Sequence, residues 1–428
     1  MLFTTLALLI VLLALSVPVA AVMGVLGLAL NKFYASMPLH RAMGEIVWNA
    51  SSEYILIAIP LFVMLGEILL RSGIAERVYN GIAQWLSWLP GGLMHANIGT
   101  CAMFAATSGS SVATAATIGT VAIPEIRKHK YHEALFLGTI AAGGTLGILI
   151  PPSINFILYG LLTNTSVPRL YLAGFVPGFL LAFLFMVIVL VACLLDREKG
   201  GTPIETSWKR RLQALPALLP PLGIFLVVVG SIYVGIATPT EAASLGVIAA
   251  LILAAVERRV SLSMLRAVAE GTMRTTAMIM LIIMAAQFLN FVLATIGLTD
   301  GLGKLIEGLG LGKIGTMILI AVFYLILGCF METISMMILT TPFIAPIVFK
   351  LGWDPIWWGI VLTVLIEAAL ITPPVGLNLY VVQGMRGRGS INEVIRGSFP
   401  FVGAMIVLIG LLMAAPDIAL WLPRYVMG

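Results

Sequence analysis

The sequence predicts an all-α polytopic membrane protein, and three observations lead to this fold class. Of the 428 residues, 60% are hydrophobic and 10% are charged, with a mean hydropathy of +1.09; this excludes a soluble globular class. Apolar runs of about twenty residues, the length that spans a bilayer, recur along the whole chain. Proline and glycine landmarks of the first half also return in the second half at a nearly constant offset, which indicates an internal repeat.

The first half is expected to contain four crossings and one re-entrant hairpin. Residues 93–126 carry Ser108-Gly109-Ser110-Ser111 midway, and each arm of about fifteen residues is too short to span the bilayer, so this run is predicted to enter and return. The paired prolines Pro151 and Pro152 break the next helix. The expected elements are a helix at Leu2 to Leu30, a span at Ile55 to Leu70, an interfacial amphipathic helix at Gly73 to Trp88, the hairpin at 93–126, the broken helix at 133–162 and a span at Tyr171 to Leu195.

The same order is predicted to repeat after a basic loop and one connecting helix. Pro124 and Pro346 are as far apart as Pro151 and Pro373. The second hairpin is then expected at 313–349, with a tip at Gly328 to Ser335, and the second broken helix at 356–383. The predicted units are a first repeat at 1–195, a cytoplasmic loop and connecting helix at 196–237, and a second repeat at 238–428.

The two repeats are predicted to be inverted, because four crossings return each repeat to its starting side and a single helix joins them. With a cytoplasmic amino terminus and a periplasmic carboxy terminus, most of the 24 Lys and Arg residues fall inside, as the positive-inside rule requires. The basic loops therefore reflect membrane topology rather than nucleic-acid binding. The three cysteines show neither a disulfide pattern nor a metal spacing.

The chemistry is expected at the hairpin tips and the helix breaks. A helix that ends within the membrane leaves carbonyl groups at its C-terminal end and N–H groups at its N-terminal end. Carbonyl and hydroxyl oxygens suit a small cation, and N–H ends suit an anion. The predicted sodium-binding residues are Ser108, Gly109, Ser110, Ser111, Pro151, Ser153, Gly328, Glu332, Thr333, Thr372, Pro373 and Gly376. The predicted substrate-binding residues are Ser110, Ser111, Thr114, Asn155, Thr333, Ser335 and Asn378.

Simpler interpretations stand beside these assignments. Small and hydroxyl residues also let membrane helices pack closely, and this applies most to Thr114 and Thr117. Glu332 and Glu367 lie at membrane depth, where an acid indicates function, but a protonated or hydrogen-bonded structural role is the alternative. Glu241 is interpreted as a helix cap. The four histidines lie in predicted loops or interfaces and indicate no proton relay, and no enzyme motif is present.

Five motifs in order give the chain a close resemblance to a known family. They are SGSSVATAATIG, IPPSINFILYGLLTNTSVPRLYLAGFVPG, GIATPTEAASLG, GCFMETISMMILTTPFIAPI and EAALITPPVGLNLY. Over essentially its whole length the chain resembles the large membrane subunit of tripartite ATP-independent periplasmic (TRAP) transporters. The resemblance implies a sodium-driven elevator in a bacterial inner membrane, importing an organic acid (a carboxylate). It also implies two partners besides the lipid bilayer, a periplasmic substrate-binding protein and a separate small subunit of about four helices.

By the same resemblance, sodium is expected at the Ser108–Ser111 tip with the Pro151–Asn155 break, and at the Glu332–Ser335 tip with the Pro373–Asn378 break. Val375 replaces the serine that follows the proline pair in the first half, so the two sites need not be chemically equivalent. Sodium is the coupling ion, and no other cofactor is expected. The alternative function is a stand-alone sodium–dicarboxylate symporter of similar hairpin architecture. A membrane scaffold or an intramembrane hydrolase would show no ion dependence.

Overall fold

The structure, a computed structural model, describes residues 1–202, 204, 206–328 and 331–428. The side chains of Leu2, Leu6, residues 106–108, Thr299, Asp300 and Glu307 also lie outside the described part. Every regular element in the described ranges is helical, as the sequence predicts. Within these ranges seven helices are long and apolar enough to cross a membrane, or eight if the bent pair at residues 133–163 forms one span. The chain is therefore a multi-span membrane protein.

The amino-terminal apolar run forms two helices, so the prediction of one helix at Leu2 to Leu30 is wrong. Helix α1 (Leu2–Ala14) ends before α2 (Val19–Tyr34) begins. Between them Ser16 takes a left-handed φ of 56°, and Pro18 occupies the N-cap of α2. Proline lacks an N–H donor and disfavours a helical conformation at the residue before it, so the helix stops here.

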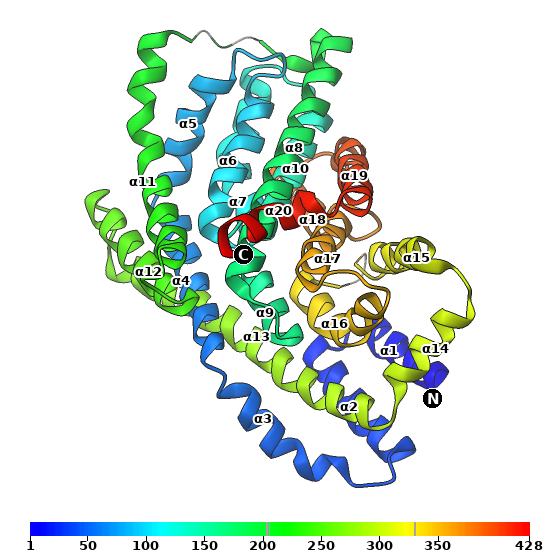
Figure 1. Cartoon of the computed structure of the whole chain (residues 1–428). Coiled ribbons are helices and arrows are strands. Elements are labelled where there is room, and N and C mark those ends of the chain that lie inside the picture. Colours follow the sequence, from blue (N-terminus) through cyan, green and yellow to red (C-terminus); the bar gives the residue numbers. More distant parts are fainter. Residues whose placement is uncertain (203, 205, 329–330) are drawn as a thin grey trace.

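The remaining helices of the first half follow the predicted order (Figure 1). They are α3 (Met43–Ser51), α4 (Ala58–Arg71), α5 (Ile74–Leu86), α6 (Leu93–Ser108), α7 (Ser111–Lys128), α8 (Glu133–Leu149), α9 (Ile154–Thr163) and α10 (Val167–Leu195). Helices α6 and α7 form hairpin 1, with tip 1 at Gly109 and Ser110. Helices α8 and α9 meet at a bend of 44°, here named break 1 (Ile150–Ser153).

The connecting helix and the helices of the second half complete the chain. They comprise α11 (Trp208–Tyr233), α12 (Pro239–Val256), α13 (Leu262–Thr295), α14 (Leu298–Gly308), α15 (Gly312–Leu327), α16 (Thr333–Lys350), α17 (Pro355–Leu370), α18 (Leu377–Arg386), α19 (Ile391–Ala414) and α20 (Asp417–Met427). Helices α15 and α16 form hairpin 2, with tip 2 at Gly328–Glu332; the predicted tip residues 329 and 330 lie outside the described residues. Break 2 (Ile371–Gly376) separates α17 from α18.

Helix α12 begins with a capping box that explains Glu241. The Thr238 hydroxyl accepts from the Glu241 N–H at 3.4 Å, and the Glu241 carboxylate accepts from the Thr238 N–H at 2.8 Å. Two N–H groups that the helix leaves unpaired are thus satisfied. This confirms the structural interpretation of Glu241.

The broken helices of the two halves are joined at close range. A Cβ atom at Gly397 of α19 would lie 1.8 Å from the Ala134 carbonyl oxygen of α8, so the two backbones touch where only glycine fits. Near this contact Arg386 of α18, with 3% of its side chain exposed, pairs with Glu133 of α8 and Glu393 of α19. The two breaks therefore belong to one packed unit.

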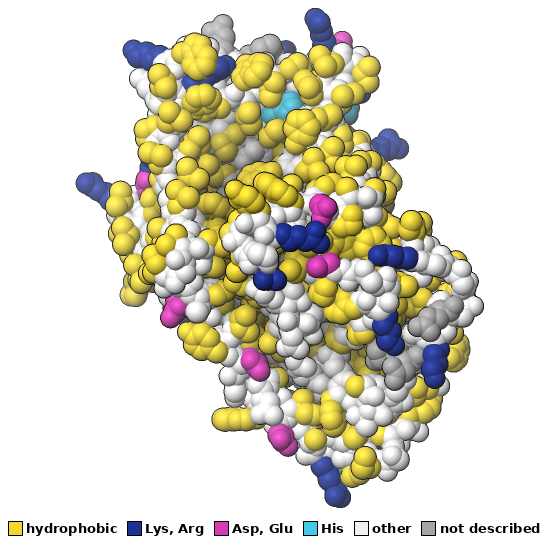
Figure 2. Space-filling model, viewed as in Figure 1, with side chains coloured by type: hydrophobic (Ala, Val, Ile, Leu, Met, Phe, Trp, Pro, Cys, Tyr) yellow, Lys and Arg dark blue, Asp and Glu magenta, His cyan; other side chains and the backbone are white. Residues whose placement is uncertain are grey.

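The outer surface suits a lipid environment. Figure 2 shows hydrophobic side chains over much of the visible face, with Lys and Arg at its upper end, along its edges, near its centre and at its lower end. Large apolar side chains on α10, α11 and α13, such as Leu195, Leu226 and Leu281, are more than half exposed. In a membrane protein these side chains face acyl chains rather than water.

Candidate functional site

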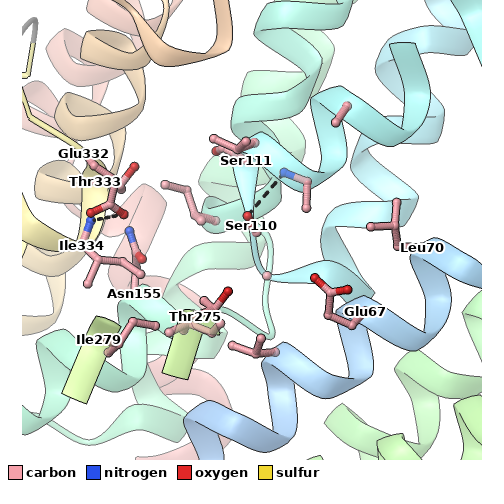
Figure 3. A pocket seen from close by; sticks show the side chains of 18 residues that line it. Glu67, Leu70, Ser110, Ser111, Asn155, Thr275, Ile279, Glu332, Thr333 and Ile334 are labelled. Carbon is pink, nitrogen blue, oxygen red and sulfur yellow. Dashed lines mark hydrogen bonds between the residues drawn. The ribbon is translucent and has the colours of Figure 1, made fainter. Parts of the chain in front are cut away.

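A cavity of about 250 Å³ lies where both hairpin tips approach break 1 (Figure 3). One wall comes from α4 and α13, through Glu67, Leu70, Thr275 and Ile279 among others. The opposite wall comes from tip 1, the start of α7, the start of α9 and the start of α16. Segments that are far apart in sequence thus meet around one space.

Three helices begin at this cavity. Their N-caps are Ser110 for α7, Ser153 for α9 and Glu332 for α16. The first N–H groups of a helix have no partner within it, and the helix dipole places partial positive charge there. Among the described lining residues there is no Lys or Arg, and the first N–H groups of α16 already donate to the Glu332 carboxylate, so the starts of α7 and α9 supply the attraction for an anionic group.

Tip 1 rests directly on break 1 and on the glycine-rich face of α8. Gly109 has a φ of +59°, and a Cβ atom there would lie 3.5 Å from the Pro152 carbonyl oxygen. A Cβ atom at Gly147 would lie 2.7 Å from the Ser110 carbonyl oxygen. The Thr114 hydroxyl also donates to that carbonyl at 2.8 Å. The position of the Ser110 carbonyl is therefore fixed on two sides.

Tip 2 is organised by Glu332. Its carboxylate accepts from the N–H groups of Ile334 and Ser335, both at 3.0 Å, and from the Ser335 hydroxyl at 3.0 Å. The start of α16 offsets the negative charge, as expected for an acid at a helix N-terminus. Gly328, on the other side of the tip, packs so closely on α17 that a Cβ atom would lie 2.1 Å from the Ala369 Cβ.

Several buried polar atoms near the breaks have no hydrogen-bond partner among the described residues. They are Ser153 Oγ, Asn155 Nδ2 and Asn378 Oδ1, and each of these three side chains is at most 1% exposed. Buried polar groups are normally paired, so these atoms have the capacity to bind a ligand, an ion or a water molecule. Hydroxyl and amide oxygens fit a sodium ion, and the Asn155 amide, which lines the cavity, fits a carboxylate.

The structure brings only part of the predicted set to the cavity. Gly109, Ser110, Ser111, Asn155, Glu332 and Thr333 line it. Thr114, Ser335 and Asn378 do not, and each bonds elsewhere; the Asn378 amide donates to the Ala141 carbonyl of α8 at 3.2 Å. Break 2, with Thr372, Pro373 and Gly376, also lies away from the cavity lining. The side chain of Ser108 lies outside the described part.

The wall formed by α4 and α13 was not anticipated. Glu67 faces the cavity and pairs with Arg71 at 2.8 Å. A Cβ atom at Gly271 of α13 would lie 2.6 Å from the Glu67 carboxyl carbon, so the two helices close around this side chain. An acid inside an apolar run was the available signal. Among the described residues no group of three His, Cys, Asp or Glu side chains is arranged to hold a metal ion.

Comparison with known proteins supplies the context for this site. The DctM component of tripartite ATP-independent periplasmic transporters matches residues 6–418. The chain is 32% identical to the C4-dicarboxylate TRAP transporter large permease protein DctM of Vibrio cholerae, over 96% of this chain and 95% of that protein. It is 34% identical to its Pseudomonas aeruginosa counterpart, over 90% of each chain.

One more relative and one solved structure are also similar to this chain. The ectoine TRAP transporter large permease protein TeaC of Halomonas elongata is 30% identical over 86% of each chain. The crystal structure of the YdaH transporter of Alcanivorax borkumensis shares the fold, with a TM-score of 0.57 and 16% identity over 99% of this chain and 98% of that one. These relatives are transport proteins rather than enzymes, and so is this chain. The chain belongs to the DctM family, the large membrane subunits of tripartite ATP-independent periplasmic transporters.

Proposed function

We propose that this subunit imports an organic acid across the bacterial inner membrane, driven by a sodium gradient. The observation that carries the proposal is the meeting of the N-termini of α7 and α9 at one cavity between the hairpin tips and the wall of α4 and α13. A carboxylate accepts hydrogen bonds from such ends. Because no basic side chain lines the described cavity, accompanying cations are the natural source of charge compensation.

The sodium ions are proposed at the two tips, each with its adjacent break. Around tip 1 the oxygen donors are the carbonyls of residues 108–110, the Ser110 and Ser111 hydroxyls, and the carbonyls of break 1. Around tip 2 they are the Glu332 carboxylate and the carbonyls of Gly328 and break 2. Gly109 against break 1 and Gly328 against α17 give each tip the contact that this pairing needs.

The transport motion is proposed to be an elevator. The hairpins and broken helices form one packed unit, and the cavity lies between this unit and α4 with α13. Sliding along that wall carries the cavity across the membrane. A periplasmic substrate-binding protein is proposed to deliver the acid, and a separate four-helix membrane subunit to complete the frame. The amino terminus is placed in the cytoplasm and the carboxy terminus in the periplasm.

Thermal unfolding of the purified subunit tests the sodium sites without knowledge of the cargo. A ligand that binds only the folded state adds about 2.7 kcal/mol of stability at a hundredfold excess over Kd. Sodium chloride should therefore raise Tm relative to choline chloride, and Ser110→Ala with Ser111→Ala should reduce this increment. Ser244→Ala is the control, because its hydroxyl donates to the Thr240 carbonyl within α12, away from both tips. Equal sodium increments in all variants would remove the assignment at tip 1.

Uptake in proteoliposomes tests the rest of the proposal. With the binding protein and the small subunit present, a labelled C4-dicarboxylate, the cargo named for two relatives, is the first compound to offer. Uptake that needs both sodium and the soluble protein supports the proposal. Sodium-dependent uptake without the soluble protein would instead establish the stand-alone symporter.

A further inference from the structure

A second cavity, of about 320 Å³, lies between hairpin 2 and the helices α1, α2 and α14, and is here named the apolar cavity. Figure 1 shows α1, α14 and hairpin 2 close together in the lower right part of the molecule. The side chains that line it are aliphatic or aromatic, apart from Thr5 and Thr340. Both hydroxyls are already bonded, Thr5 to the Met1 carbonyl at 3.0 Å and Thr340 to the Met336 carbonyl at 2.7 Å. The apolar cavity therefore suits an apolar ligand.

The apolar cavity opens to the surface that faces the membrane. Leu305, Leu319 and Phe323 line it, and each of them is 39% or more exposed. Apolar cavities do not hold water, and an unfilled cavity leaves its lining atoms without dispersion contacts on one side. In the hydrocarbon region of a bilayer the molecules available to fill it are lipid acyl chains.

A smaller cavity, of about 240 Å³, lies at the open end of hairpin 2. It adjoins the apolar cavity, because Ile306 lines both. Its polar lining consists of Lys350, Thr316 and the start of α15 at Gly312, and it is here named the Lys350 cavity. Among the described residues no acid lines either cavity or forms an ion pair with Lys350. The ammonium group and the positive end of the helix dipole together favour an anion.

The two cavities follow one another along hairpin 2. On α15 the lining runs from Thr316 in the Lys350 cavity to Leu327 in the apolar cavity, and on α16 it runs from Lys350 to Leu339. At ~1.5 Å per residue, Thr316 and Leu327 are about 16 Å apart along the helix axis. The hydrocarbon of one leaflet is about 15 Å thick, half of the bilayer core. The two cavities thus match the phosphate and one acyl chain of a phospholipid.

We propose that hairpin 2, α1 and α14 bind one membrane phospholipid, with its phosphate at Lys350 and the start of α15 and one acyl chain in the apolar cavity. The lipid lies between hairpin 2 and the surrounding helices. An acyl chain changes conformation more readily than closely packed side chains do, so hairpin 2 meets a deformable neighbour on this side. The proposal concerns lipid binding alone, and it holds or fails independently of the cargo and of sodium coupling.

A photoreactive lipid tests this site on the whole subunit. The probe is phosphatidylglycerol with a diazirine in one acyl chain, added to the subunit in dodecyl maltoside micelles, and the cross-linked peptides are identified by mass spectrometry. Labelling of α14 and hairpin 2 should exceed that of α11, whose Leu226 is 58% exposed, close to the 54% of Leu305. A diacylglycerol with the same photoreactive chain but no phosphate is the second probe.

Two substitutions separate the acyl chain from the phosphate. Leu305→Trp fills the mouth of the apolar cavity and should reduce labelling by both probes; Leu226→Trp, the same change on α11, is its control. Lys350→Gln should reduce labelling by phosphatidylglycerol about fivefold, which corresponds to about 1 kcal/mol for one basic side chain at an anionic lipid, and should leave labelling by diacylglycerol unchanged. Lys32→Gln, an exposed lysine on α2 that lines neither cavity, is the control for charge.

Three results would overturn the proposal. The first is labelling of hairpin 2 that is no stronger than that of α11. The second is phosphatidylglycerol labelling that Lys350→Gln leaves unchanged, and this exposed position keeps the test valid even if Leu305→Trp fails to fold. The third comes from the same labelling of the complex with the small membrane subunit: loss of the hairpin 2 signal there would show that protein, rather than lipid, fills the apolar cavity. Labelling that persists in the complex supports the phospholipid.

Discussion

Replacing Gly147 by alanine tests whether the Ser110 carbonyl belongs to a cation site. The new Cβ atom would lie 2.7 Å from that carbonyl oxygen and 2.9 Å from the Thr114 hydroxyl. An ordinary contact begins at 3.4 Å, so the start of α7 must retreat by about 0.7 Å. Overpacking of this kind costs roughly 1–3 kcal/mol of folding free energy.

The displaced carbonyl should also weaken sodium binding. Each tenfold increase in Kd removes about 1.4 kcal/mol from the stabilisation that saturating sodium provides. The assay is thermal unfolding in sodium chloride and in choline chloride, with Gly230→Ala as the matched control. A Cβ atom at Gly230, within α11, meets nothing within 4 Å, so this change should be neutral or stabilise by up to about 1 kcal/mol. A destabilised Gly147→Ala that keeps the full sodium increment would show that the Ser110 carbonyl is not a ligand.

Two other changes test the Glu332 carboxylate of tip 2 and the ion pairs that Arg386 forms with Glu133 and Glu393. Glu332→Gln keeps only one of two acceptor oxygens at the start of α16, so it should lose about 1 kcal/mol of stability and most of the sodium increment in Tm; an unaltered increment would exclude its carboxylate as a ligand. Arg386→Ala should cost about 2–3 kcal/mol, less than a fully buried pair, because its acidic partners are partly exposed. Arg266→Ala is the control, because the Arg266 side chain is 81% exposed although it pairs with Glu270. This change should alter stability by under about 1 kcal/mol, measured for both arginine variants by chemical denaturation. Equal effects of the two variants would contradict this account.

The main breaks of the fold were predictable because the residues that cause them act locally. The pairs Pro151-Pro152 and Pro373-Pro374 interrupt their helices, although Pro220 and Pro221 are accommodated inside α11. A run such as Ser108–Ser111 between apolar arms marks a tip. The split between α1 and α2 at Ser16–Pro18 has the same cause. The hydropathy of residues 2–30 alone predicts one helix, and the single Pro18 divides it.

The composition of the site was less predictable, because it depends on which distant helices meet. Glu67 within an apolar run indicates a functional position, but the sequence does not show that α4 lies opposite tip 1. Nor does spacing alone show that Asn378 turns to the Ala141 carbonyl while Asn155 faces the cavity. The sequence does indicate which residue types suit a cation or a carboxylate. Whether these residues line the same cavity or lie in different places depends on how the two halves pack together.

The contact between Gly138 and Gly397 determines where this molecule is stiff. A Cβ atom at Gly138 would lie 2.1 Å from the Gly397 carbonyl oxygen, so no side chain separates the backbones of α8 and α19. Side chains between helices can change rotamer and so allow small relative movements. At the contact of Gly138 with Gly397, here named the seam, no side chain lies between the backbones. We therefore expect α8 and α19 to move together, whereas the wall of α4 and α13 meets the tips across a cavity. Spectroscopic labels placed across the seam should keep a constant separation, whereas labels placed across that wall should report whatever movement the subunit makes.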